Sequence, residues 1–202
     1  MTVAANNRTI LRCKPGATPL YTRGPAAVLR THGGIMFPYQ PDISYSQQVN
    51  YNNYDLVHTN YSVNAYANTP SPSIQLTATF ASVTEDEGLY TLGVLHFLRS
   101  VTKMWSGLDN DDGSVPMAGT PPPVLSFSSF GSQLFERVPV VVTNFSTTFD
   151  SGVDLKYVNG QQIPVMQTIA LDLMIQQSPD RQKLVFNTRS FVNGNSYTDG
   201  FV

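Results

Sequence analysis

The sequence predicts a mainly β (α+β) fold, a six-stranded β-sandwich or partly closed barrel with one long helix at its side. Six stretches either alternate apolar with polar residues or carry a short apolar run, and turn-forming residues separate them. One stretch alone, at about residues 84–106, has helical periodicity over several turns. The expected order is therefore three strands, a helix and three more strands, which suits a β structure that the helix plugs or flanks.

The composition is that of one globular domain with few charges. The chain has 202 residues, of which 41% are hydrophobic and 13% are charged, and this charged share is about half the usual one. Tyr, Asn, Ser, Thr and Gln take the place of the missing charges. Such a surface repels copies of itself only weakly, which favours broad polar contacts with other subunits.

Residues 1–36 are expected to form an extended basic arm ahead of the β domain. Residues 1–41 carry five basic side chains and no acidic one, whereas the rest of the chain carries seven basic and fourteen acidic ones. Proline and glycine interrupt this segment throughout. Because the body is acidic, we expect the arm to contact another protein subunit; nucleic acid binding and a solvated tail are the alternatives. The contacts are assigned to the arginines Arg8, Arg12, Arg23 and Arg30.

Three strands are expected before the helix, in a β domain that spans residues 37–180. Residues 43–51 and 56–66 carry tyrosines and aliphatic residues among polar ones. Residues 74–80 alternate between apolar residues and Gln or Thr, which predicts a half-buried strand. The sequence NTPSP at residues 68–72 predicts the turn before it.

The predicted helix has clear signals at both ends. Thr84 is placed as the N-cap, and Glu87 three residues later completes a capping box. Acidic residues fill the first turn, basic ones lie near the end, and Gly107 suits the position just past the C-terminus. One apolar side is expected to pack on the sheet, and it consists of Val94, Phe97, Leu98, Val101, Met104 and Trp105.

A second flank of this helix has more apolar and basic residues than a lone domain needs. We expect this flank to contact an adjacent subunit. Its residues are Leu92, Leu95, His96, Arg99 and Lys103.

The chain after the helix begins with a loop and continues with three strands. Residues 108–123 form the loop, and its three aspartates fail the EF-hand spacing, which indicates a solvated acidic loop. Strands are expected at 124–130, 138–149 and 165–175, with a hairpin turn at Asn159-Gly160. The tail, residues 181–202, is expected to pack on a neighbour or to fray.

No motif in the sequence predicts catalysis. Cys13 is the single cysteine, and His32, His58 and His96 share no metal-ligand spacing. Nucleophile elbows, phosphate-binding loops and dinucleotide-binding glycine motifs are missing. We therefore expect no enzyme, no cofactor and no metal site. No apolar run is long enough to span a membrane, and no secretory signal is recognised.

Six tyrosines between residues 39 and 66 allow two interpretations. They could form a stacking platform for a sugar or for single-stranded nucleic acid. Packing within sheets and at subunit contacts is the interpretation we favour, because aromatic residues are common in both. A carbohydrate-binding β-sandwich on a tail or cell surface is therefore the alternative function.

Several stretches taken in order carry a resemblance to a known family. They are FPYQPDISYSQQVNY (37–51), LGVLHFLRSVTKMWSG (92–107), GTPPPVLSFSSFG (119–131), FERVPVVVTNFSTTF (135–149) and IPVMQTIALDLMIQQSP (163–179). Together they resemble the baseplate-hub and tail-tube-initiator proteins of contractile-tailed bacteriophages. The resemblance covers about residues 37–180, so it implies nothing about the first 36.

This resemblance implies a structural role in the virion. Proteins of this family have a tail-tube fold, and their copies join into a ring, usually of six, whose inner strands form a continuous barrel. The expected partners are other copies of the chain and other hub and tube proteins. Phage DNA would pass through the lumen without specific binding, and assembly would take place in the host cytoplasm.

Overall fold

A computed structural model describes residues 8–13, 20, 24–104, 119–131, 133–149, 151–158, 160–184, 186–196 and 200–202. Residues 108–118 of the predicted acidic loop at 108–123 lie outside these residues. So do Arg23, Trp105, Gly107 and Asn159. The first strands are β1 (Ile10–Cys13), β2 (Gly34–Met36), β3 (Asp42–Ser46), β4 (Asn50–Tyr54), β5 (Val63–Asn68) and β6 (Ser73–Ala81). The later ones are β7 (Leu125–Ser129), β8 (Phe135–Thr148), β9 (Leu155–Val158), β10 (Gln161–Pro164) and β11 (Met166–Ile175). The helices are η3 (Pro25–Thr31, a 3-10 helix), α1 (Glu85–Val101), α2 (Pro179–Leu184) and α3 (Thr188–Val192).

Seven strands form one antiparallel sheet in the order β2-β1-β7-β8-β11-β6-β3. The pairs β4–β5 and β9–β10 form separate two-stranded ribbons. The predicted mainly β (α+β) class with one main helix is confirmed. The sheet is not closed into a barrel, and the described strands form one large sheet where two facing sheets were expected.

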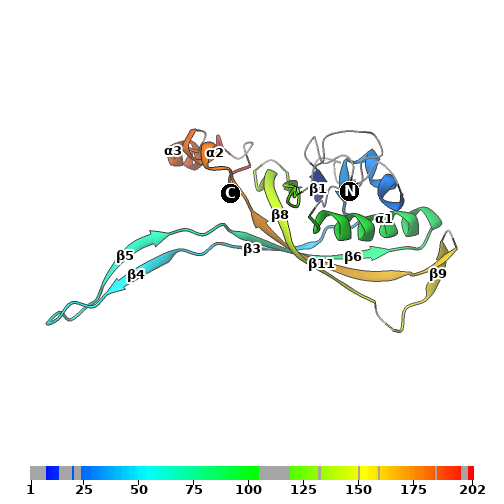
Figure 1. Cartoon of the computed structure of the whole chain (residues 1–202), viewed down its shortest axis with the longest axis horizontal. Helices are drawn as coiled ribbons and strands as arrows, with labels where there is room; N and C mark the ends of the chain where they lie inside the picture. Colours follow the sequence, from blue (N-terminus) through cyan, green and yellow to red (C-terminus); the bar gives the residue numbers. More distant parts are fainter. Residues whose placement is uncertain are drawn as a thin grey trace.

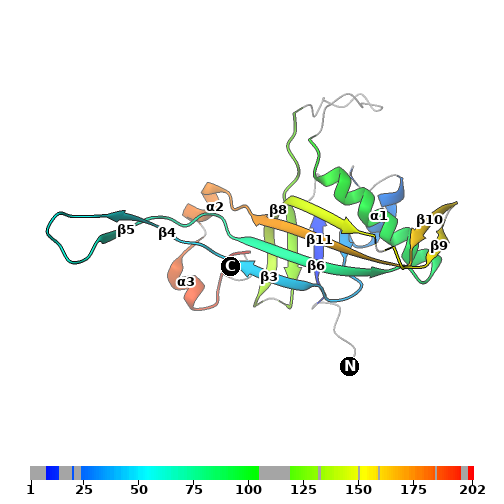
Figure 2. The ribbon, with the colours of Figure 1, turned by 90° about the horizontal axis from the view of Figure 1, so that it is seen from below.

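The long strand β8 joins two halves of this sheet. Its residues from Phe135 to Val140 pair with β7, and those from Val140 to Thr148 pair with β11. Figure 2 shows β7 crossing β11 and β6 at a steep angle. The core fills the space between the halves, and its largest side chains, Phe37, Phe80, Phe97 and Phe127, are at most 2% exposed. α1 lies on this core side of β6 (Figure 1).

The predicted start of the helix is confirmed. The Thr84 side chain accepts a hydrogen bond from the Glu87 backbone N–H, and the Glu87 carboxylate accepts one in return from the Thr84 N–H. The helix ends earlier than expected, at Val101 with Thr102 as its C-cap. Met104 therefore lies beyond the helix and is 62% exposed, although it was expected to pack on the sheet.

The described part of residues 1–36 belongs to the body of the protein and not to an extended arm. β1 pairs with both β2 and β7, so it is an interior strand of the sheet. Leu11, Leu29 and Ile35 are fully buried. Of the Pro and Gly residues that suggested an arm, Gly24 and Pro25 begin η3 and Gly33 follows its end.

The extended arm of this protein lies elsewhere, between β3 and β6. Residues 47–72 leave the body as a long ribbon built on β4 and β5, and the ribbon projects far from the core (Figure 1). Every residue from 51 to 69 is exposed. The two strands expected at 43–51 and 56–66 are therefore wrong in position: the first is divided between β3 and β4, and the second begins only at Val63.

The C-terminal residues pack in part on their own chain. Phe201 is 6% exposed, its ring lies 5.0 Å from that of Phe186, and the guanidinium of Arg181 lies above it. The Gln177 amide donates to the Gly200 carbonyl at 2.6 Å. The tail thus covers the region beside β8, where fraying or a contact with a neighbour was expected.

Candidate assembly surfaces

The predicted contact flank of α1 is divided between the core and the surface. Leu95 is only 7% exposed and belongs to the core, so its assignment to a subunit contact is wrong. Leu92 is half-buried, whereas His96, Arg99 and Lys103 are exposed.

The second flank of α1 is covered in part by η3 of the same chain. η3 packs on α1 so closely that a Cβ atom added at Gly93 would lie 2.8 Å from the Pro25 carbonyl oxygen. The surplus of apolar residues on the helix is therefore largely used by the N-terminal segment. The part of the flank that stays exposed is its basic edge, namely His96, Arg99 and Lys103.

The N-terminal arginines lie on the surface of the body where the structure describes them. Arg8, Arg12 and Arg30 are exposed. They come from different elements, since Arg12 is in β1 and Arg30 in η3. Their expected role in subunit contacts stays a prediction.

A feature that sequence reasoning missed is the uncovered face of β3, β6, β11 and β8. The core side chains Ile74, Leu76, Ala78 and Phe80 alternate along β6 with exposed Ser, Gln and Thr, so one face is buried and the other is open. No described helix covers this open face, which is viewed in Figure 2. We call it the open face.

The open face carries short polar side chains in rows that cross the four strands. The strand register places one row as Asp42, Thr77, Ala170 and Ser146. The next row is Ser44, Gln75, Asp172 and Asn144. Among the described residues in these rows the ionisable side chains are the two aspartates, so the rows are acidic. The alternation along β11 also places the exposed Met166 and Met174 on this face.

Asp172 is held in place on this face. Its Oδ2 accepts a hydrogen bond of 3.1 Å from the Asn144 side-chain amide on the neighbouring strand β8. The cross-strand bond keeps the carboxylate against the sheet surface. Asp42, at the edge in β3, is exposed. Both carboxylates therefore place negative charge on the open face.

Two strand edges border the open face, one on each side. β3 pairs with β6 alone among the described strands. On the far side, β8 from Phe145 to Thr148 pairs with β11 and with no other described strand. Unpaired strand edges bind other strands readily, so these edges are natural sites for pairing between copies. Because each step from β3 to β8 is antiparallel, the β3 of a second copy would meet this β8 edge in antiparallel orientation.

The ribbon at residues 47–72 is a third exposed surface, and we call it the arm. The tyrosines Tyr51, Tyr54, Tyr61 and Tyr66 are between 52% and 87% exposed. Tyr51 and Tyr66 meet edge to face with ring centroids 6.2 Å apart. The only charged residue of the arm is Asp55. An isolated two-stranded ribbon is at best marginally stable in water, so the arm is a candidate surface for a contact with another protein.

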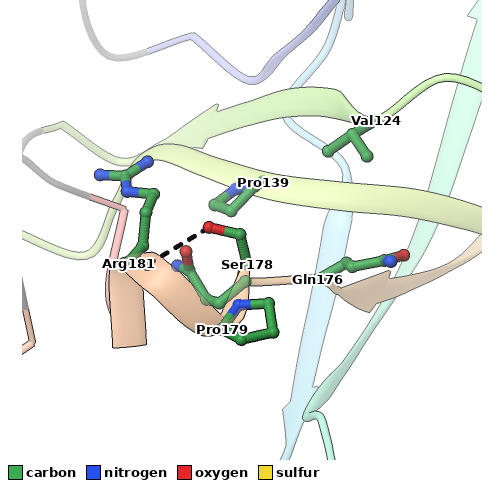
Figure 3. Close-up of a pocket in the computed structure, with 7 residues that line it drawn as sticks. Val124, Pro139, Gln176, Ser178, Pro179 and Arg181 are labelled. Carbon is green, nitrogen blue, oxygen red and sulfur yellow. Dashed lines mark hydrogen bonds between the residues drawn. The ribbon is translucent and has the colours of Figure 1, made fainter. Parts of the chain in front are cut away.

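A pocket of about 290 Å³ lies between β8 and the start of α2 (Figure 3). Val124, Pro139 and Pro179 form its apolar walls. Arg181 is the one charged residue of its lining, and its backbone N–H donates to the Ser178 hydroxyl. The lining has no carboxylate, histidine or cysteine, so this pocket offers no acid–base pair.

Other chemical groups in the described residues give no further site. No three of their His, Cys, Asp and Glu side chains gather in a way that could hold a metal ion. Burial raises the pKa of the Cys13 thiol to about 12, which keeps it protonated and unreactive at neutral pH. No helix in this part of the chain is long and apolar enough to cross a membrane.

Comparisons with known proteins leave the interpretation to the geometry. A scan against protein-family models finds no match, and a search of curated proteins finds no relative by sequence. The features that bear on function are therefore the open face, the two strand edges beside it and the arm.

Proposed function

We propose that this chain is a structural virion protein of a contractile phage tail, in the baseplate hub or the ring that initiates the tail tube. Copies would join side by side through the β3 edge of one and the β8 edge of the next. The open face would then line a channel that conducts DNA, and α1 with the N-terminal segment would form the outer wall. The order of motifs in the sequence supports the same assignment.

The observation that carries this proposal is an acidic sheet face with an unpaired strand edge on each side. A soluble monomer gains nothing from leaving two edges open, since exposed edges invite aggregation. A head-to-tail contact between different edges repeats from copy to copy and closes into a ring when the rotation allows it. The two aspartates of the face would repel the phosphates of passing DNA and prevent adhesion.

Electron microscopy and mass photometry of the purified chain over a range of concentrations test this proposal. We expect closed rings, either from the chain alone or after addition of the neighbouring hub and tube proteins. A chain that stays monomeric and joins no tail particle would contradict the proposal.

The charge of the open face has a separate test in the assembled state. Replacing Gln75, Thr77 and Thr79 with Lys changes exposed positions of the interior strand β6 and leaves both edge strands unchanged, so rings should still form. These rings should retain double-stranded DNA at low salt and release it as the salt concentration rises, because phosphate contacts weaken steeply with salt. Asp172→Lys is a less suitable variant, since it removes the carboxylate that accepts the hydrogen bond from Asn144.

One observation keeps a second function open. The tyrosines of the arm are exposed, as rings that stack on a sugar would be. Screening the chain against a glycan array tests this directly, and specific binding that disappears in Tyr61→Ala would support a carbohydrate-binding module. The absence of binding would remove this alternative.

A further inference from the structure

The seven-stranded sheet has a third edge, at β2, and a side chain hydrogen-bonds to the backbone of this edge. β2 is an outer strand that pairs with β1 alone. The Phe37 N–H donates to the Thr9 carbonyl and the Cys13 N–H donates to the Gly33 carbonyl, each at 3.0 Å. In an antiparallel ladder the residues between such bonds turn their backbone groups to the outside. Met36 is therefore one of the residues whose N–H and C=O point away from the sheet.

The hydroxyl of Tyr90 forms hydrogen bonds with both of these outward groups. It accepts a hydrogen bond of 2.8 Å from the Met36 N–H and donates one of 2.8 Å to the Met36 carbonyl. This is the pattern that a pairing strand would form with Met36. Burial raises the pKa of Tyr90, so the phenol stays protonated and can donate.

The rest of β2 adds little that another strand could use. The strand is three residues long, and its other outward residue is Gly34, which weakens a strand and has no side chain to pack. The N–H and C=O of Met36 are thus the main backbone groups on this side of the sheet to which another strand could bind.

We infer that Tyr90 is a specificity-determining residue for assembly: its hydroxyl closes the β2 edge against strands of other copies. Among the described edges of the seven-stranded sheet, those of β3 and β8 then remain for pairing between copies. This inference rests on the proposed ring in one respect, namely that the open edges are the ones that the ring uses. Edge closure itself needs no ring.

The test uses the full-length chain with Tyr90→Phe, which removes the hydroxyl and keeps the ring. Without its bond the Met36 amide should exchange with solvent about tenfold faster, as expected for the loss of one hydrogen bond. Light scattering and thioflavin T fluorescence should show several times more strand-paired species outside the normal assembly. Tyr157→Phe is the matched control, because Tyr157 is 68% exposed and lies in β9, away from this edge.

A second variant separates edge exposure from a general loss of stability. Lysine on an edge strand opposes pairing, so Met36→Lys in the Tyr90→Phe background should remove the additional species. Additional species that persist in the double variant would show that destabilisation causes them, and the inference would be wrong. Unchanged assembly and exchange in Tyr90→Phe would overturn it as well. A wild-type chain without rings, combined with strand-paired Tyr90→Phe, would refute the ring and leave edge closure standing.

Discussion

At the scale of residues, the N-cap of α1 shows how a local sequence pattern becomes a measurable property. Hydrogen bonds from backbone N–H groups, first that of Thr84 and then that of Val83, lower the pKa of the Glu87 carboxyl below its ordinary value of 4.5. The folded state therefore favours the charged form. Its stabilising contribution is present above about pH 4.5 and is lost as the pH falls through the lowered pKa.

Glu87→Gln tests this contribution by its pH dependence. At neutral pH we expect the variant to unfold at a lower temperature than the wild type, because an amide binds the backbone N–H groups less strongly than a carboxylate. The difference should shrink as the pH falls below 4.5 and the wild-type carboxylate becomes protonated. Thermal unfolding by circular dichroism measures it. Glu85→Gln is the control, and an equal effect in both variants would assign the change to the helix dipole alone.

At the scale of elements, the packing of η3 on α1 decides whether the N-terminal segment belongs to the domain. Gly93→Leu keeps good helix propensity but puts a side chain where the Pro25 carbonyl lies. We expect the free energy of unfolding to fall by about 1–3 kcal/mol, as for other overpacked sites. Denaturant unfolding measures this change, and amide exchange in residues 25–31 should accelerate.

The control for this packing is Ser100→Leu, which adds the same side chain to an exposed position of α1. It should change stability little. A Gly93→Leu protein as stable as this control would mean that η3 is not held against the helix.

The arm can be tested without disturbing the body. Ser46 and Ser73 are directly opposite each other where β3 and β6 leave the sheet. Replacing residues 47–72 with Asn-Gly should therefore close a two-residue hairpin. Residues 51–69 of the arm are exposed, and the Ile175 N–H donates to the carbonyl of Pro72 at its base. The free energy of unfolding should therefore fall by no more than about 1 kcal/mol, as for the loss of one hydrogen bond.

The same variant reports on the role of the arm. If the arm contacts another subunit, the shortened chain should remain a folded monomer and fail to join tail particles, as seen by electron microscopy. Normal assembly without the arm would show that its tyrosines serve another purpose.

Local features could be predicted from the sequence, whereas the packing of one helix or strand on another largely could not. The capping box and the alternation along β6 depend on neighbours within a few residues, so their patterns are visible in the sequence. The second apolar face of α1 was assigned to a neighbouring subunit because η3, about sixty residues earlier, has too little periodicity to reveal that it covers the helix. The arm was hard to see for the opposite reason: its tyrosines suggested buried strands, although no aliphatic face accompanies them.

At the scale of the whole molecule, the proposed ring depends on contacts between copies. Its open face has polar rows, two carboxylates and two free edges, and its third edge is closed by Tyr90. The three features agree on one arrangement, in which the sheet extends sideways from β3 to the β8 of the next copy. The proposed function depends on that arrangement, because only a closed ring would turn the open face into a channel.

A disulfide between the two edges is the most direct test of this claim. Within one copy, β3 and β8 are three strand spacings apart, about 14 Å, whereas a disulfide needs Cα atoms within about 7 Å. In a Cys13→Ser background, Ser44→Cys would be combined in turn with cysteine at Asn144, Ser146 or Thr148, and oxidised under assembly conditions. The account predicts that one of these pairs gives a covalent ladder that ends at the size of the ring. A protein that assembles normally but forms no such link in any of the three pairs would contradict it.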